Sequence, residues 1–207
     1  MTTSFDDLFG ESPVMAILRG LGPSRTLELA ETAWSLGILC VEVPLQTDRD
    51  AESLALVAAR AATRGLAVGA GTILDVSDVE RARGLGARFT VSPGLDPQVA
   101  AASVHAGMPH LPGVATGTEV HRARRLGLLW QKAFPAAELG PSWIRAMHAP
   151  FPDVSFVATG GISTANAAHF LEAGASAVAV GSALEDDAQL GLLADLVRFR
   201  SIGATSA

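Results

Sequence analysis

Lysine occurs only once in this chain. Of its 15 lysines and arginines, 14 are arginines and one is Lys132. Lys132 lies in the segment 128–134, whose alternating pattern predicts a β-strand with Trp130, Lys132 and Phe134 on one face. A lysine on a packed face is costly unless it is paired, neutral or used in chemistry. A neutral amine can attack a ketone and form a Schiff base, whereas the guanidinium of arginine stays protonated. Lys132 is therefore a candidate nucleophile; the alternatives are a lysine paired with a carboxylate, or one that points outward in a register shifted by one residue.

Glu42 is the candidate acid–base partner of this amine. It lies in the apolar sequence Cys40-Val41-Glu42-Val43-Pro44, where an acid is rarely buried without a purpose. Formation of a Schiff base, its dehydration and the cleavage of a carbon–carbon bond all require proton transfers. The alternative is a structural ion pair with Arg19, at the end of the preceding predicted strand. The two alternatives are compatible, because such a pair would also orient the acid.

Other catalytic chemistries have no matching motif. The five histidines show neither the H-x-H nor the H-E-x-x-H spacing, so we expect no metal ion and no metal-dependent mechanism. A serine nucleophile elbow is also missing. Cys40, the one cysteine, excludes an intramolecular disulfide, fits a reducing compartment and is interpreted as a small core residue.

A repeating unit must position these residues. An Ala- and Leu-rich helical stretch ends in a loop with glycine, and a short apolar run follows it. Gly37, Gly65, Gly86, Gly107, Gly127 and Gly174 occupy such loops. Together with two runs that lack this glycine signal, the pattern predicts eight strands, at residues 15–19, 39–44, 67–71, 88–92, 110–114, 128–134, 155–159 and 177–181.

Strands that alternate with helices pair in parallel through right-handed crossovers, and eight such units predict a closed (β/α)₈ TIM barrel, an α/β fold. An open doubly wound sheet is less favoured, because no G-x-G-x-x-G follows the first strand. We expect one domain over residues 1–207. Residues 1–12 are expected to hold a short extra helix with Ser4 as its N-cap, which closes the N-terminal end of the barrel.

The polar residues of the predicted strands gather at one end of that barrel. Arg19, Glu42, Thr72 and Lys132 all lie at or near the carboxyl ends of strands, where active sites of this fold form. The pairs Gly160-Gly161 and Gly181-Ser182 close the last two strands, and loops at these two positions frequently bind phosphate through backbone N–H groups. The alternative for these glycines is an ordinary turn.

The composition limits the function classes further. Hydrophobic residues make up 49% of the chain and charged residues 17%, as in a well-packed globular protein. The net charge of −6 gives no basic field, so we expect no nucleic-acid partner. The acidic N-terminus and the absence of a long apolar stretch predict neither a signal peptide nor a membrane span, and therefore a soluble cytoplasmic protein.

The ordered set of motifs resembles the 2-keto-3-deoxy-6-phosphogluconate (KDPG) aldolase family, which includes the phosphogalactonate aldolases. The matching segments are Ala16-Ile17-Leu18-Arg19-Gly20, Val41-Glu42-Val43-Pro44, Gly69-Ala70-Gly71-Thr72, Ser92-Pro93-Gly94, Leu111-Pro112-Gly113, Lys132-Ala133-Phe134-Pro135, Gly140-Pro141, Thr159-Gly160-Gly161-Ile162 and Gly181-Ser182. The resemblance covers almost the whole chain, from about residue 13 to residue 200.

The resemblance implies a class I aldolase that needs no cofactor and no metal. It implies that Lys132 forms the imine, that Glu42 is the general acid–base, and that the substrate is a phosphorylated keto sugar acid cleaved to pyruvate and glyceraldehyde 3-phosphate. It further implies a homotrimer. Its other matched residues are Thr72 and Pro93 at the pyruvyl part of the site, Phe134 beside the lysine, Arg19 toward substrate anions, and Gly160, Gly161, Gly181 and Ser182 at the phosphate.

Two departures from the family pattern concern the substrate. Gln46 stands where some members have an arginine, and Ala133 stands where an aromatic residue often follows the lysine. The same chemistry on the galacto epimer or on 4-hydroxy-2-oxoglutarate therefore stays open. A phosphate-binding isomerase or epimerase barrel, and a binding module without turnover, are more remote alternatives.

Overall fold

The computed structural model describes residues 4–10 and 12–198. Its strands are β1 (Val14–Ile17), β2 (Cys40–Pro44), β3 (Val68–Gly71), β4 (Phe89–Val91), β5 (His110–Leu111), β6 (Gly113–Val114), β7 (Trp130–Ala133), β8 (Ser155–Ala158) and β9 (Ala177–Val180). Its helices are α1 (Phe5–Phe9), α2 (Pro23–Ser35), α3 (Asp48–Thr63), α4 (Val76–Gly84), α5 (Pro97–His105), α6 (Gly117–Arg125), α7 (Ala136–Leu139), α8 (Pro141–His148), α9 (Ala167–Glu172), the 3₁₀ helix η1 (Ser182–Glu185) and α10 (Asp187–Val197).

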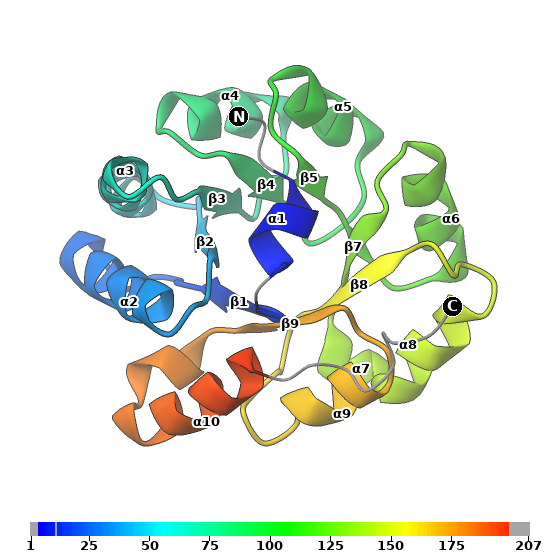
Figure 1. The fold of residues 1–207 in the computed structure, drawn as a ribbon. Helices are drawn as coiled ribbons and strands as arrows, with labels where there is room; N and C mark the ends of the chain where they lie inside the picture. Colours follow the sequence, from blue (N-terminus) through cyan, green and yellow to red (C-terminus); the bar gives the residue numbers. More distant parts are fainter. Residues whose placement is uncertain (1–3, 11, 199–207) are drawn as a thin grey trace.

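The strands form one parallel sheet in the order β5-β4-β3-β2-β1-β9-β8-β7-β6. β5 and β6 are two halves of one predicted strand, interrupted at Pro112. Because β5 pairs with β4 and β6 pairs with β7, this interrupted strand brings the two ends of the sheet together into a ring surrounded by helices (Figure 1). The predicted α/β TIM-barrel class is confirmed, and the open doubly wound sheet is excluded.

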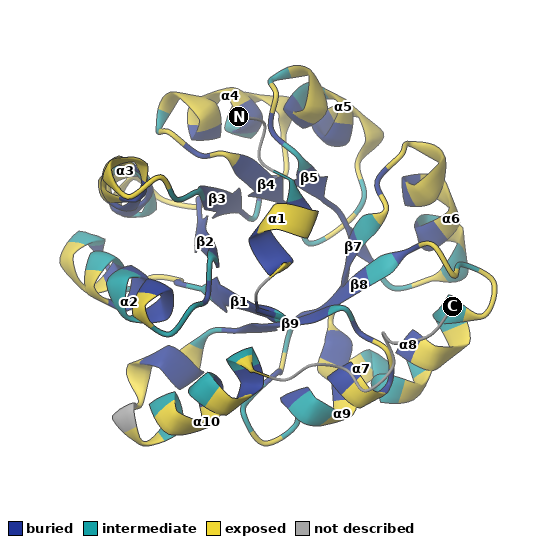
Figure 2. Cartoon of the chain, in the orientation of Figure 1, coloured by how far each residue is buried: buried dark blue, intermediate teal, exposed yellow. Residues whose placement is uncertain are grey.

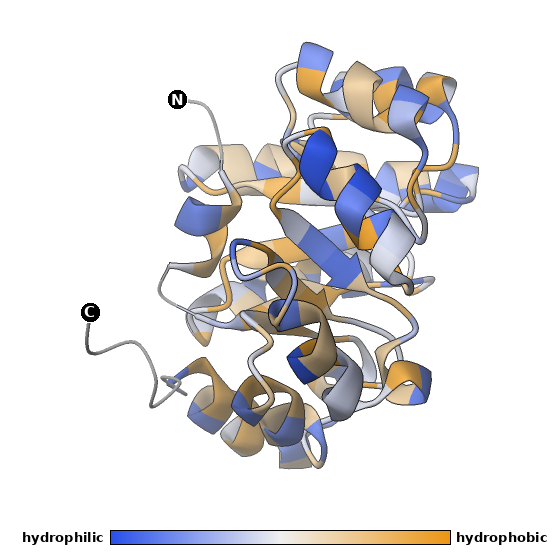
Figure 3. Cartoon of the chain, turned by 90° about the vertical axis from the view of Figure 1, so that its right-hand side faces the viewer, coloured by the Kyte–Doolittle hydropathy of each residue, from blue (hydrophilic) through white to orange (hydrophobic). Residues whose placement is uncertain are grey.

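Side chains alternate between the inside and the outside of the ring, as the period of a β-strand requires. Met15, Cys40, Val157 and Ala179 belong to the cluster inside the ring, whereas Val41 and Ala158 belong to the larger cluster under the helices. The strands are therefore buried on both faces, and the outward faces of the helices are exposed (Figure 2). The helices accordingly carry both hydrophilic and hydrophobic segments (Figure 3). None of the helices within the described residues is long and apolar enough to span a membrane.

Helix α1 fills the N-terminal end of the barrel. Ser4 is its N-cap and accepts a hydrogen bond from the backbone N–H of Asp7 at 3.1 Å. Phe9 stacks on Trp130 with ring centroids 4.8 Å apart, and Trp130 donates a hydrogen bond to Asp6. Figure 1 shows the helix at the centre of the ring of strands. The predicted segment 1–12 and the predicted domain 1–207 also include residues 1–3, 11 and 199–207, which lie outside the described residues.

Local signals in the sequence set where the helices begin and end. Thr47 and Asp50 form a capping box at the start of α3, and Thr116 and Glu119 form another at the start of α6. All six glycines predicted to end a helical stretch have positive φ: Gly37, Gly65, Gly86, Gly107, Gly127 and Gly174. The capping boxes define where helices begin after a strand, and the glycines define where helices end before the next strand.

Candidate active site

The predicted site residues lie at the carboxyl-terminal end of the barrel, opposite to α1. Each of these residues lies within a strand of the ring or just after it. They are Arg19 (β1), Glu42 (β2), Thr72 (β3), Pro93 (β4), Lys132 and Phe134 (β7), Gly160 and Gly161 (β8), and Gly181 and Ser182 (β9). The structure therefore places all ten at the end where sites of this fold form.

Lys132 points into the barrel. Its neighbour Gln131 faces outward and donates hydrogen bonds to the carbonyl oxygens of Val120 and Leu128, so Lys132 occupies the opposite, inner face of β7. Only 5% of the Lys132 surface is exposed, and Nζ lies 5.0 Å from the centre of the Phe134 ring. Among the described residues, no carboxylate oxygen comes within the 4.0 Å of an ion pair with Nζ. The outward-pointing and ion-paired alternatives for this lysine are therefore not found.

Glu42 is the inward-facing acid across from this amine. β1, β9 and β8 separate β2 from β7 on one side of the ring, and β3, β4 and the β5–β6 strand separate them on the other. Glu42 is 1% exposed, and neither of its side-chain oxygens has a hydrogen-bond partner among the described residues. Burial raises the pKa of the Glu42 carboxyl above its usual value, and the positive charges of Lys132 and Arg19 oppose that rise. A carboxyl group with a raised pKa is suited to proton transfer.

Gly71 makes room for the Glu42 carboxyl group. A Cβ atom built on Gly71 overlaps Oε1 of Glu42. The position does not need glycine for its backbone, because Gly71 is not among the residues with positive φ. The absence of a side chain at Gly71 therefore leaves the space that the Glu42 carboxyl group occupies inside the barrel.

Gly71→Ala is expected to lower kcat/KM of the reaction catalysed at this site by about 10²-fold, because a displacement of about 1 Å at a reacting group can cost that much. The fold should persist, as judged by circular dichroism. The control is Gly84→Ala at the end of α4, where nothing lies within 4 Å of the added Cβ. Equal kcat/KM for both variants would contradict the role assigned to Gly71.

Arg19 contacts neutral groups rather than Glu42. Its Nη1 donates a hydrogen bond to Oε1 of Gln46, and its Nη2 lies 3.4 Å from the Thr72 hydroxyl. The structural ion pair between Arg19 and Glu42, which was the alternative to a catalytic role for Glu42, does not form within 4.0 Å among the described residues. Thr72 has φ of 60°, a rare conformation for a β-branched residue and one that often marks functional sites. The backbone hydrogen bonds of its neighbours Gly71 and Ile73 hold it there.

The loops above the barrel are packed against each other through glycines. A Cβ on Gly160 would lie 3.0 Å from the Phe134 ring, and one on Gly161 would lie 2.5 Å from Cβ of Ala137. Both glycines have positive φ. Close packing and backbone conformation thus already explain Gly160 and Gly161. β8 and β9 are neighbours, which brings these glycines beside the loop of Gly181 and Ser182. Binding of phosphate at this place stays a prediction.

The structure gives three residues contacts or a place in the site that the sequence did not indicate. Gln46 binds Arg19, Gly71 accommodates Glu42, and Thr159 is a buried residue at the end of β8. A signal existed for Gly71, because glycine inside a strand often marks the close approach of another group. The contact between Gln46 and Arg19 joins the ends of two strands and has no local signature.

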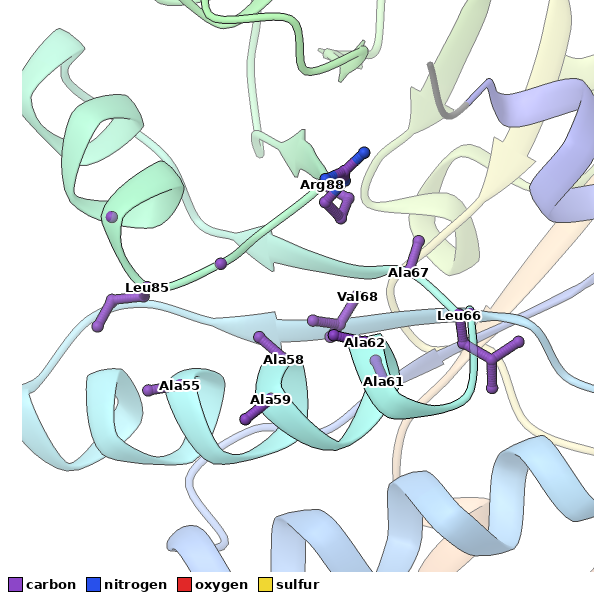
Figure 4. Close-up of a pocket in the computed structure, with 13 residues that line it drawn as sticks. Ala55, Ala58, Ala59, Ala61, Ala62, Leu66, Ala67, Val68, Leu85 and Arg88 are labelled. Atoms are coloured by element: carbon purple, nitrogen blue, oxygen red, sulfur yellow. The ribbon is translucent and has the colours of Figure 1, made fainter. Parts of the chain in front are cut away.

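Two further findings delimit the site. Among residues 4–10 and 12–198, no three His, Cys, Asp or Glu side chains gather as metal ligands would. A cavity of about 700 Å³ opens on the flank of the barrel, between α3 and the loop from α4 to β4, and six of its 13 lining residues are alanines (Figure 4). It contains neither Lys132 nor Glu42, so we place the candidate chemistry at the mouth of the barrel.

Comparisons with known proteins agree with this geometry. The family model described as "KDPG and KHG aldolase" matches residues 5–195. The chain is 36% identical to a probable 2-dehydro-3-deoxy-6-phosphogalactonate aldolase of Rhizobium meliloti, over 95% of this chain and 92% of the relative. It is 39% identical to a 2-dehydro-3-deoxy-phosphogluconate aldolase of Treponema pallidum, over 72% of this chain and 74% of the relative.

Among solved structures, the chain is similar to a KDPG aldolase from Legionella pneumophila with pyruvate captured as a covalent carbinolamine intermediate. The TM-score is 0.79 and the sequence identity is 29%, with 95% of this chain and 98% of that chain covered.

Proposed function

Because the chain belongs to the KDPG and KHG aldolase family, we propose that it is a class I aldolase that cleaves 2-dehydro-3-deoxy-6-phosphogluconate to pyruvate and glyceraldehyde 3-phosphate. The observation that carries this proposal is one buried lysine that has no ion-pair partner among the described residues and faces a buried acid across the barrel. The covalent pyruvate in the similar Legionella structure supports the same chemistry for Lys132.

In the proposed reaction, Nζ of Lys132 forms a bond to C2 of the substrate, and loss of water from the carbinolamine leaves an iminium ion. Glu42 removes the proton of the C4 hydroxyl group. The C3–C4 bond then breaks, its electron pair moves into the iminium, and the aldehyde leaves. Protonation of the resulting enamine at C3 and addition of water release pyruvate and the free amine.

The remaining residues have binding roles in this proposal. The face of the Phe134 ring near Nζ favours the positive charge of the iminium. Thr72 and Arg19 hold the substrate carboxylate, Pro93 borders the pyruvyl group, and Gly160, Gly161, Gly181 and Ser182 hold the phosphate. No metal and no cofactor takes part. Assembly into a homotrimer stays a prediction.

The substrate is tested by measuring release of pyruvate from the gluco epimer, the galacto epimer and 4-hydroxy-2-oxoglutarate, each with EDTA present. We expect the highest kcat/KM for the gluco epimer. Preference for the galacto epimer, which the Rhizobium relative is named for, would correct the substrate and keep the chemistry. Activity that EDTA removes and added metal restores would overturn the Schiff-base mechanism.

A further inference from the structure

Arg19 at the mouth of the barrel is held by an acceptor that carries no charge. Its Nη1 donates to the amide oxygen of Gln46, and its Nη2 faces the Thr72 hydroxyl. Arg19 and Gln46 line a cavity of about 390 Å³ together with the loop that begins α3. Arg19 is exposed there, and no ion pair with a carboxylate forms within 4.0 Å among the described residues.

The two acids in the first turn of α3, beside this cavity, already have other partners. Oδ2 of Asp50 accepts hydrogen bonds from the backbone N–H groups of Gln46 and Thr47, at 3.2 and 2.9 Å, and from the Thr47 hydroxyl at 2.9 Å. Asp48 pairs with Arg81 at 2.7 Å. The Asp50 carboxylate therefore fixes the backbone of Gln46, and the Gln46 side chain in turn fixes Arg19.

We infer that Gln46 is a positioning residue that holds the Arg19 guanidinium without neutralising it, so that its charge remains available for the carboxylate of the keto acid. The inference rests on the proposed function. An amide oxygen accepts a hydrogen bond in the same geometry as a carboxylate oxygen but adds no negative charge. A carboxylate at the same place would form a charge-assisted pair with Arg19 and compete with the bound anion.

Gln46→Glu is the decisive variant, because it keeps the length and the acceptor and adds only a charge. The measurement is the pyruvate concentration at which borohydride capture of the protein is half-maximal. We expect this concentration to rise about tenfold or more in Gln46→Glu, and by a smaller factor in Gln46→Met, which loses the acceptor and adds no charge. The maximal extent of capture at saturating pyruvate should stay unchanged in both.

Two controls separate this effect from a general effect of charge or folding. Gln98→Glu makes the same chemical change in the first turn of α5, at the same end of the barrel, where the side chain is exposed; it should leave the half-maximal concentration unchanged. In the background of Arg19→Met, Gln46→Glu should have no further effect, because its effect passes through Arg19.

The outcomes distinguish this inference from the proposed function. Absence of any pyruvate capture in the unmodified protein would refute the Schiff-base function itself. Normal capture by the unmodified protein and an unchanged half-maximal concentration in Gln46→Glu would overturn only the role of Gln46. An equal rise of the half-maximal concentration in Gln46→Glu and Gln46→Met would also overturn this role. So would a rise caused by Gln46→Glu that persists in the Arg19→Met background.

Discussion

Lys132→Arg is expected to abolish covalent capture of pyruvate by borohydride and to lower kcat for aldol cleavage by about 10⁴-fold or more. Arginine keeps the positive charge but has no amine that can form an imine, and loss of a covalent nucleophile removes most of the rate enhancement. The unmodified protein should gain the mass of one reduced pyruvate adduct, whereas the variant should gain none at its side chains. Intact-protein mass spectrometry measures both results.

The composition of the chain offers a sharp control for this experiment. The double variant Lys132→Arg, Arg125→Lys again has one lysine, now at an exposed position in the last turn of α6. It should remain unlabelled, because reactivity depends on the barrel interior and not on the mere presence of an amine. Labelling of the double variant, or of Lys132→Arg at a side chain, would disprove the assignment; only the N-terminal amine competes with Lys132 in the unmodified chain.

Glu42→Gln is expected to lower kcat by about 10²- to 10⁴-fold, which is the usual contribution of a general acid–base. Pyruvate should still be captured on long incubation with borohydride, because Lys132 is intact, but capture should be slower. The measurement compares steady-state cleavage with the rate of capture. A variant with unchanged kcat would remove Glu42 from the mechanism.

The same variant should be more stable than the unmodified protein at neutral pH. The pKa of Glu42 is raised in the folded state, mainly by burial. Because the pKa is raised above its ordinary value of about 4.5, the stability that the protonated carboxyl contributes is complete below that value and is lost as the pH rises through the folded pKa. At neutral pH the raised pKa of Glu42 therefore corresponds to a lower free energy of unfolding, and glutamine removes this cost. The difference in melting temperature between Glu42→Gln and the unmodified protein should shrink as the pH falls toward about 4.5. A difference that does not depend on pH would contradict this explanation of the stability gain.

The alternation of residue types predicted which side chains enter the barrel. Lys132 and Glu42 face the interior because side chains in a strand alternate, and because the carboxyl ends of parallel strands meet at one end of the sheet. The helix caps and the short helix at residues 5–9 were also predictable, since their signals lie within a few residues of each other. The family resemblance supplied the roles of the substrate-binding residues.

Contacts between the ends of different strands were not predictable in the same way. An ion pair of Arg19 with Glu42 was the alternative that the sequence left open, and Arg19 binds Gln46 instead, because the loop before α3 is held by Asp50. The overlap of Gly71 with Glu42 depends on how neighbouring strands are staggered in space. The break at Pro112 arises where one strand changes partners, from β4 to β7, and no local pattern marks that exchange.

The closure of one end of the barrel by α1 has a consequence for the order of events in the proposed reaction. Phe5, Leu8 and Phe9 fill that end, so substrate and both products share a single passage at the mouth. Pyruvate stays attached to Lys132 when the aldehyde forms nearer the opening. The aldehyde must then depart first, and in the synthetic direction pyruvate must enter first. The proposed mechanism therefore predicts ordered kinetics with pyruvate as the last product released.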